Sequence, residues 1–314
     1  MNPLAILIGL AAGFASALLF AGVVLQSMLA VVLSLIAPLP IFIASLGWGS
    51  LVGFVAAGAA AVTIGAITGA PASGLLLFAA IALLAAAIGH VAGLARLADD
   101  GRPAGPNGAP ALDWFPVPRI LFAIALVAAL ACLFVGWLVG FDAAAIGDEL
   151  GRALSTQIGD PASQDQVDRL AHQVVTLIPF LQPALLVAML AVCLYFAASI
   201  TRLSGKLARP RDDLPAKASA LPRPALLVFG AGLVASFAPG TLGNVGAVVA
   251  GSFGMGFTLA GLAAIHRMTR ATRSRGLILF ALYMAILLLT FPLFVATIIG
   301  LSETARRPSA IPSP

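Results

Sequence analysis

Residues 1–95 read MNPLAILIGLAAGFASALLFAGVVLQSMLAVVLSLIAPLPIFIASLGWGSLVGFVAAGAAAVTIGAITGAPASGLLLFAAIALLAAAIGHVAGLA and contain no Lys, Arg, Asp or Glu. The first charged side chain is Arg96, and His90 is the one ionisable side chain before it. A soluble domain carries roughly one charged residue in four. A charge at the centre of a membrane-spanning helix costs roughly 2.5–3.5 kcal/mol on insertion scales. The stretch therefore predicts a membrane block of about four helices.

The remainder of the 314-residue chain keeps this character, with 61% hydrophobic and 9% charged residues overall. The apolar runs are long and continuous, whereas the strands of a membrane β-barrel alternate in short segments. They predict an all-α polytopic membrane protein with about 8–9 transmembrane helices and a short amphipathic helical segment on the outer face. In chain order we expect a charge-free block over 1–95, a flexible cytoplasmic loop over 96–117, a helical hairpin over 118–200, a basic cytoplasmic loop over 201–223, C-terminal helices over 224–300 and a disordered tail over 301–314.

An acidic insert over residues 142–176 interrupts the predicted hairpin. It holds six acidic residues and two arginines. Ile146, Leu150, Leu154 and Ile158 recur every four residues, which places them on one face of a helix. A proline ends this stripe, and a second apolar stripe follows it, made of Val167, Leu170, Val174 and Val175. The pattern predicts two short amphipathic helices that lie on the extracytoplasmic surface of the membrane.

Basic residues are concentrated in three other loops and orient the chain. Residues 96–119, 202–223 and 267–275 hold three, six and four of them. The positive-inside rule places these loops in the cytoplasm and the acidic insert outside. We therefore expect a multi-pass protein of a bacterial inner membrane with a cytoplasmic N-terminus, and nine crossings would leave the tail outside. The net charge of +5 then comes from basic loops that fix the topology next to membrane lipid. No nucleic-acid partner is expected.

Small residues follow one another at a spacing of four in the first predicted helix. They are Gly9, Gly13, Ala17 and Ala21. Such stripes let helix backbones approach closely, and packing drives helix association where lipid removes the hydrophobic advantage. Two interpretations remain open, since the stripe can dock a partner subunit or pack against another helix of the same chain.

Catalytic and metal-binding patterns are missing. Every carboxylate lies in a loop or at a membrane boundary, and the spacings typical of hydrolases and zinc proteins are absent. His90 and His266 fall near the cytoplasmic ends of their predicted spans, and Cys132 and Cys193 lie inside apolar runs, where a disulfide is not expected. We expect no enzyme activity, no catalytic residue, no metal site and no cofactor.

Polar side chains gather toward the outer ends of the predicted helices. A shallow ligand site there would use Gln26, Trp137, Gln182, Thr241 and Asn244, with the acidic insert as a lid. Small-ligand sites are mostly apolar with a few polar contacts, as this set would provide. The alternative is that these residues simply mark helix ends.

Three stretches carry a resemblance to a known family: APLPIFIASLGWG over 37–49, GLAAIH over 261–266 and GLSE over 300–303. Together with the acidic helical insert they resemble the YybS-like family of uncharacterised bacterial membrane proteins. That family is distantly similar to the substrate-binding (S) components of energy-coupling-factor vitamin transporters. The resemblance implies a helical subunit that binds a small molecule from outside. It also implies docking by small-residue helix faces onto a transmembrane coupling subunit that carries two ATPases.

Two functions follow as hypotheses. The first is a non-enzymatic small-molecule binding subunit of a membrane transporter. The second is a structural or assembly protein that binds other membrane proteins through its stripes and basic loops.

Overall fold

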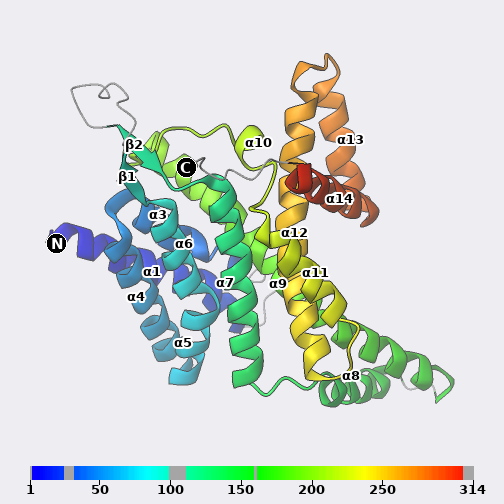
Figure 1. Ribbon diagram of the computed structural model, residues 1–314. Helices are drawn as coiled ribbons and strands as arrows, with labels where there is room; N and C mark the ends of the chain where they lie inside the picture. The colour runs from blue at the N-terminus through cyan, green and yellow to red at the C-terminus, as the bar shows by residue number, and fades with distance from the viewer. Residues whose placement is uncertain (1, 25–31, 99–110, 159–160, 307–314) are drawn as a thin grey trace.

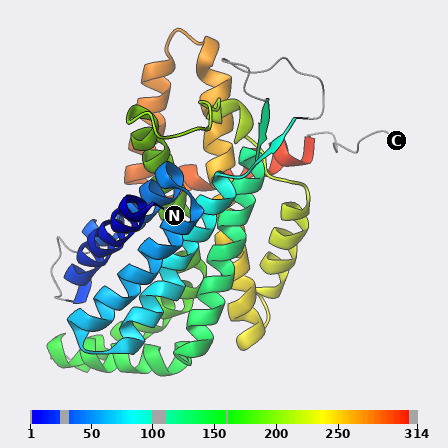
Figure 2. The ribbon, with the colours of Figure 1, turned by 90° about the vertical axis from the view of Figure 1, so that its left-hand side faces the viewer.

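The structure, a computed structural model, describes residues 2–24, 32–98, 111–158 and 161–306 (Figures 1 and 2). Within these ranges the regular structure is helical, apart from one antiparallel pair of short strands, β1 (Ala95–Leu97) and β2 (Leu112–Trp114). Gln26, most of the predicted loop over 96–117 and the end of the predicted tail lie outside the described residues.

Six helices are long and apolar enough to cross a membrane. They are α1 (Pro3–Val24), α4 (Ser50–Thr68), the continuous run of α5 (Pro71–Leu77), η1 (Phe78–Ala82) and α6 (Leu83–Ala92), then α7 (Val117–Leu138), α9 (Pro161–Leu203) and α12 (Thr241–Met268). A seventh results if α13 (Arg275–Leu288) and α14 (Phe291–Arg306), bent by 119°, count as one span. By helix length and hydropathy the chain is a multi-pass membrane protein, and the prediction of eight or nine crossings is wrong.

Two of the expected crossings fail because their helices are short. Residues 32–48 form a short apolar stretch in which a turn at residues 35–37 separates the helical residues 32–34 from the 11-residue α3 (Pro38–Trp48), and residues 224–238 contain the 12-residue α11 (Pro224–Ala235). At 1.5 Å per residue a helix of this size covers about 18 Å, against roughly 30 Å of bilayer core. Pro38 and Pro40 explain the first case, because proline removes backbone donors and interrupts the helix.

The break before α3 has its backbone acceptors satisfied by other helices. The Ser16 hydroxyl on α1 donates to the carbonyl of Ala37 at 2.6 Å, and the Cys193 thiol on α9 donates to the carbonyl of Leu35 at 3.3 Å. Irregular backbone at membrane depth is tolerated only where such partners exist. The break is therefore part of the packed bundle. Cys193 and Cys132 are both free thiols.

The small-residue stripe of α1 packs against α4 inside the chain. All four of its residues are buried, and a Cβ added to Gly13 would lie 2.2 Å from the carbonyl oxygen of Ala56. The opposite face of α1, with Phe14 half exposed, points outward. Of the two interpretations left open, intramolecular packing is the one the fold uses, so Gly9, Gly13, Ala17 and Ala21 are not a free docking face.

The acidic insert forms a helical hairpin at one end of the bundle (Figures 1 and 2). Its first helix is α8 (Ala143–Ile158), as expected. Its second is not separate, since it is the beginning of the 43-residue α9. Of the predicted second stripe, Val167 and Val175 are buried, whereas Leu170 and Val174 are 59% and 56% exposed. A helix of this length measures about 64 Å, twice the bilayer core. The acidic part of α9 therefore projects beyond its apolar part.

The three basic loops meet at the opposite end of the bundle, which we call the basic end. Arg209 donates to the carbonyl of Ala92 at 3.1 Å and to that of Phe115 at 2.9 Å. Arg267, just before the short η3 (Thr269–Ala271), donates to the Ser219 hydroxyl at 2.5 Å. The grouping agrees with their predicted placement on one side of the membrane.

The end of α14 is also packed at the basic end. The prediction of a disordered tail from residue 301 is wrong up to Arg306, where α14 ends. Thr304 is fully buried and its hydroxyl accepts the backbone N–H of Leu221 at 3.0 Å. Glu303 accepts from Arg267 at 2.5 Å. The motifs GLAAIH and GLSE meet where α12 and α14 cross, since a Cβ on Gly261 would lie 3.0 Å from the backbone nitrogen of Gly300.

Candidate functional site

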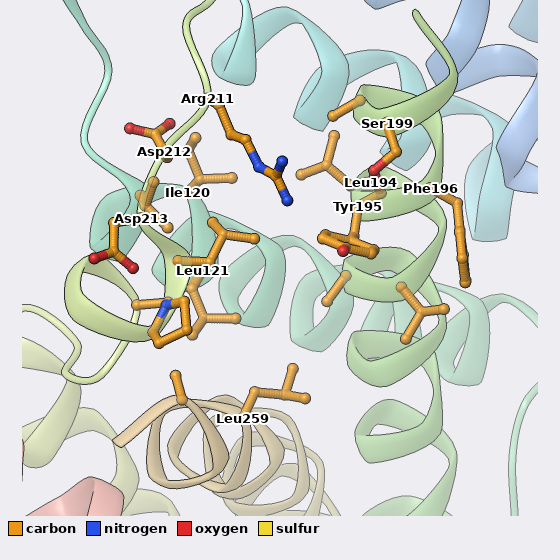
Figure 3. A pocket seen from close by; sticks show the side chains of 18 of the residues that line it. Ile120, Leu121, Leu194, Tyr195, Phe196, Ser199, Arg211, Asp212, Asp213 and Leu259 are labelled. Carbon is orange, nitrogen blue, oxygen red and sulfur yellow. The ribbon is translucent and has the colours of Figure 1, made fainter. Parts of the chain in front are cut away.

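A cavity of about 1310 Å³ opens at the basic end (Figure 3). The ends of α7, α9 and α12 form its walls, with α13 and the loop that carries the short α10 (Leu214–Lys217) beside them. Ordinary ligand sites measure roughly 300–1,000 Å³. The space is therefore large enough for a sizeable organic molecule.

The part of the cavity that lies among the helices is apolar. Ile120 and Ile124, one helical turn apart on α7, are both buried and line one wall. Tyr195 and Phe196 of α9 stand half exposed at the edge of the opposite wall, and Leu259 of α12 closes the bottom of the view in Figure 3. An apolar group that enters here leaves water for an apolar surrounding, which is favourable.

The part of the cavity at the loops is charged. Its lining includes five arginines and two aspartates, an excess of three formal positive charges. They are Arg202, Arg209, Arg211, Arg270 and Arg275, with Asp212 and Asp213. The site thus combines an apolar interior with a basic rim.

The two aspartates are already engaged by cations of the chain. Asp212 accepts from Arg209 at 2.7 Å and from Lys217 at 2.5 Å. Burial alone would raise the pKa of Asp212, but the hydrogen bonds from Lys217 and Arg209 outweigh it and lower the pKa below its ordinary value. Asp213 accepts from Arg270 at 2.6 Å, and this hydrogen bond lowers the pKa of its carboxyl as well. Both side chains are therefore ionised at neutral pH and occupied.

Three of the arginines have no such partner. Within the part of the chain that the structure describes, the side chains of Arg202, Arg211 and Arg275 make no hydrogen bond or ion pair. The Nε of Arg202 is buried and unsatisfied, which costs roughly 1–3 kcal/mol for a polar group and more for a charged one. Figure 3 shows the guanidinium of Arg211 reaching over the cavity toward Tyr195. Their donors are available to an anion.

A hydrogen bond holds α13 beside the cavity. The Nε2 of His266 on α12 lies 2.8 Å from the hydroxyl of Tyr283 on α13, and both residues line the space. α13 buries none of its own residues. Its position next to the cavity therefore rests on this contact, on the turn that follows η3 and on α14.

The ligand residues predicted from the sequence lie elsewhere. Trp137 at the far end of α7 is 77% exposed, Gln182 on α9 and Thr241 at the start of α12 are exposed, and Asn244 is half buried. None of the four lines the cavity. They belong to the end of the bundle where α8 lies, so the structure does not bring them into the site that it shows, and Gln26 lies outside the described residues.

Sequence reasoning missed the arginines of the rim because it assigned all of them to topology. A basic loop next to a membrane span has the same composition whether its charges face water or a cavity. The sequence carried one signal for these arginines, namely the large number of basic residues in two loops. The loops over 202–223 and 267–275 hold ten basic residues between them. The apolar wall gave no signal, since buried and lipid-facing positions use the same residues.

No group of three or more His, Cys, Asp or Glu side chains that could hold a metal ion occurs among the described residues. Near α8, Asp148 and His172 form a pair at 3.0 Å beside a small surface hollow, and both side chains are largely exposed. The cavity at the basic end is therefore the candidate site.

Comparison with known proteins adds no assignment to this geometry. A scan against protein-family models, a search of curated proteins and a search of solved structures each returned no match to the chain.

Proposed function

We propose that the protein is a non-enzymatic membrane protein that binds a small molecule in the cavity at its basic end. The observation that carries the proposal is the cavity itself, which joins buried apolar walls to arginines without partners. By the positive-inside rule this end faces the cytoplasm. The proposed site therefore lies on the side opposite to the one that the sequence suggested.

We further propose that the bound molecule is a transport substrate and the protein a subunit of a transporter of the inner membrane. The resemblance to the YybS-like family and to S components supports this part. A coupling subunit with ATPases would be the partner. Because the stripe on α1 is covered by α4, docking would use another surface.

A steric block of the cavity tests binding. Ser199 of α9 lines the space, whereas its neighbour Ile200 does not and is 40% exposed. Full-length protein carrying Ser199→Trp would be purified in mild detergent, and the molecules that stay bound would be extracted and identified by mass spectrometry. We expect wild type and Ile200→Trp to retain the same small molecule and Ser199→Trp to lose it. Equal retention by Ser199→Trp, with unchanged thermal stability, would remove the cavity as the binding site.

A second function, assembly of other membrane proteins, is favoured by one observation. α13 buries none of its residues, and Leu277 and Phe280 on it are 70% and 64% exposed. A photocrosslinker at Phe280 in native membranes would distinguish the two. Capture of an ATPase-bearing coupling subunit supports transport, whereas capture of division, envelope or insertion proteins supports assembly.

A further inference from the structure

The ligand that this cavity can take is restricted by two features that occur together. One is an apolar interior at the depth of the membrane spans, and the other is a basic rim at their ends. A water-soluble anion would use the rim and leave the interior empty. A neutral apolar molecule would use the interior and leave the arginines without counter-charges.

The rim carries three more positive than negative side chains, and its two carboxylates are already paired. Asp212 is shared by Arg209 and Lys217, and Asp213 is held by Arg270, so neither carboxylate is left for the other arginines. The Nε of Arg202 is buried without an acceptor. Guanidinium groups bind phosphate oxygens through paired N–H donors, more favourably than they bind most neutral acceptors.

The edge of the cavity indicates how such a ligand would enter. Val192, Tyr195 and Phe196 follow one another on α9 at this edge and are 48%, 51% and 51% exposed. They belong to a helix that is long and apolar enough to cross a membrane. In a bilayer, such a helix would present this edge to acyl chains. A ligand with a long apolar tail can therefore lie with its tail along α9 and its head at the rim.

We infer that the cavity binds a phospholipid with a net negative headgroup, whose phosphate is held by Arg202, Arg211 and Arg275 and whose chain occupies the apolar walls of α7, α9 and α12. This inference rests on the proposed function and names its ligand class.

The test compares lipids that share acyl chains and differ in charge. Full-length protein would be exchanged into phosphatidylcholine nanodiscs doped with phosphatidylglycerol, and lipid retention would be measured by native mass spectrometry after release into detergent. Glycerol phosphate would serve as the headgroup without a chain. Arg211→Gln and Arg275→Gln would be compared with Arg273→Gln, because Arg273 lies two residues from Arg275, is exposed and does not line the cavity.

We expect wild type to retain phosphatidylglycerol selectively over phosphatidylcholine. Each of Arg211→Gln and Arg275→Gln should weaken that retention about tenfold, the scale of one charge-assisted hydrogen bond, and Arg273→Gln should leave it unchanged. Arg211 is exposed, so its replacement leaves folding intact. Equal weakening by Arg273→Gln would show that the rim merely attracts anionic surfaces and would overturn the inference.

Two further outcomes separate this inference from the proposed function. Equal retention of both lipids by wild type, abolished by Ser199→Trp, would leave the cavity as a binding site and overturn the assignment to an anionic lipid. Displacement of phosphatidylglycerol by glycerol phosphate at equal concentration would show that the chain contributes nothing and would overturn the lipid assignment. Retention unaffected by Ser199→Trp would overturn both proposals.

Discussion

At the scale of single residues, Asp212 and Asp213 show how burial changes the value of an ion pair. The Asp212 side chain is 12% exposed, and its partner Arg209, at 11%, also donates to the carbonyls of Ala92 at the end of α6 and of Phe115 just after β2. Asp213 and Arg270 are 45% and 42% exposed. Exposed pairs contribute little because water and salt screen them, whereas removing one partner of a buried pair leaves a charge uncompensated. Asp212 is therefore the residue that fixes the loop at the basic end.

The first prediction concerns the pH dependence of this contact. The folded-state pKa of Asp212 is lowered below its ordinary value of 3.8, so its stabilisation is fully present above that value and is lost as pH falls through the folded pKa. Thermal unfolding in detergent should show this loss in wild type. Asp212→Asn should lower the free energy of unfolding at neutral pH by about 1–3 kcal/mol and reduce the acid-dependent part. Asp213→Asn is the control, and an effect as large as that of Asp212→Asn would contradict the argument.

At the scale of elements, the helices were the most predictable feature and their continuity the least. The apolar runs gave the positions of α1, α4, α7 and α12 because a membrane helix must satisfy its own backbone and be apolar along its length. Composition does not show where a helix is interrupted and whether the gap is covered. The break before α3 depends on donors from Ser16 and Cys193, which are distant in the sequence.

The second prediction concerns the close approach of α1 and α4. Gly13→Leu should place its side chain against the backbone of Ala56, where even a Cβ would be 2.2 Å from the carbonyl oxygen. We expect lower yield and a loss of about 2–3 kcal/mol in stability, the upper range for overpacked cores. Phe14→Leu on the exposed face should change neither. A stable Gly13→Leu protein that lost a copurifying membrane protein would instead restore the docking interpretation of the stripe.

The third prediction concerns the crossing of α12 and α14. A Cβ on Gly261 would lie 1.7 Å from the carbonyl oxygen of Ala296, and one on Gly300 would lie 2.0 Å from that of Phe257. Gly261→Leu should therefore separate the two helices and destabilise the protein by at least about 2–3 kcal/mol in thermal or denaturant unfolding. Gly276→Leu, where a Cβ meets nothing within 4 Å, should be tolerated. Comparable damage from both substitutions would argue against this crossing.

At the scale of the whole molecule, the site was less predictable than the fold. Its walls come from α7, α9 and α12, which are far apart in the sequence, and their apolar residues have the same pattern whether they face a cavity or lipid. The predicted ligand residues were polar groups at helix ends, and the structure shows Trp137, Gln182 and Thr241 exposed there. Charge bias predicted correctly that the basic loops lie together, but it could not separate arginines that set topology from arginines that line a site.

The path of α13 and α14 determines where the chain ends. Nine crossings would place the end of the chain outside, away from the basic loops. In the structure α13 leaves the basic end and the chain bends by 119° at residues 289–290. α14 then brings Glu303 back to Arg267 and Thr304 back to Leu221, both at the basic end. Both ends of the bent pair, Arg275 and Arg306, therefore lie at the basic end.

The fourth prediction is that the C-terminus lies in the cytoplasm. A reporter fused after Arg306 should give the same signal as one placed after Arg273 and the opposite signal to one placed between α8 and α9. The basic residues Arg306 and Arg307 would then obey the positive-inside rule, which an external tail would violate. An alkaline phosphatase fusion is active only outside, and a fluorescent protein fusion only inside. Each fusion point is therefore assigned to one side of the membrane by two independent reporters. An external signal after Arg306 would require α13 and α14 to straighten into a full crossing, and it would separate Glu303 from Arg267.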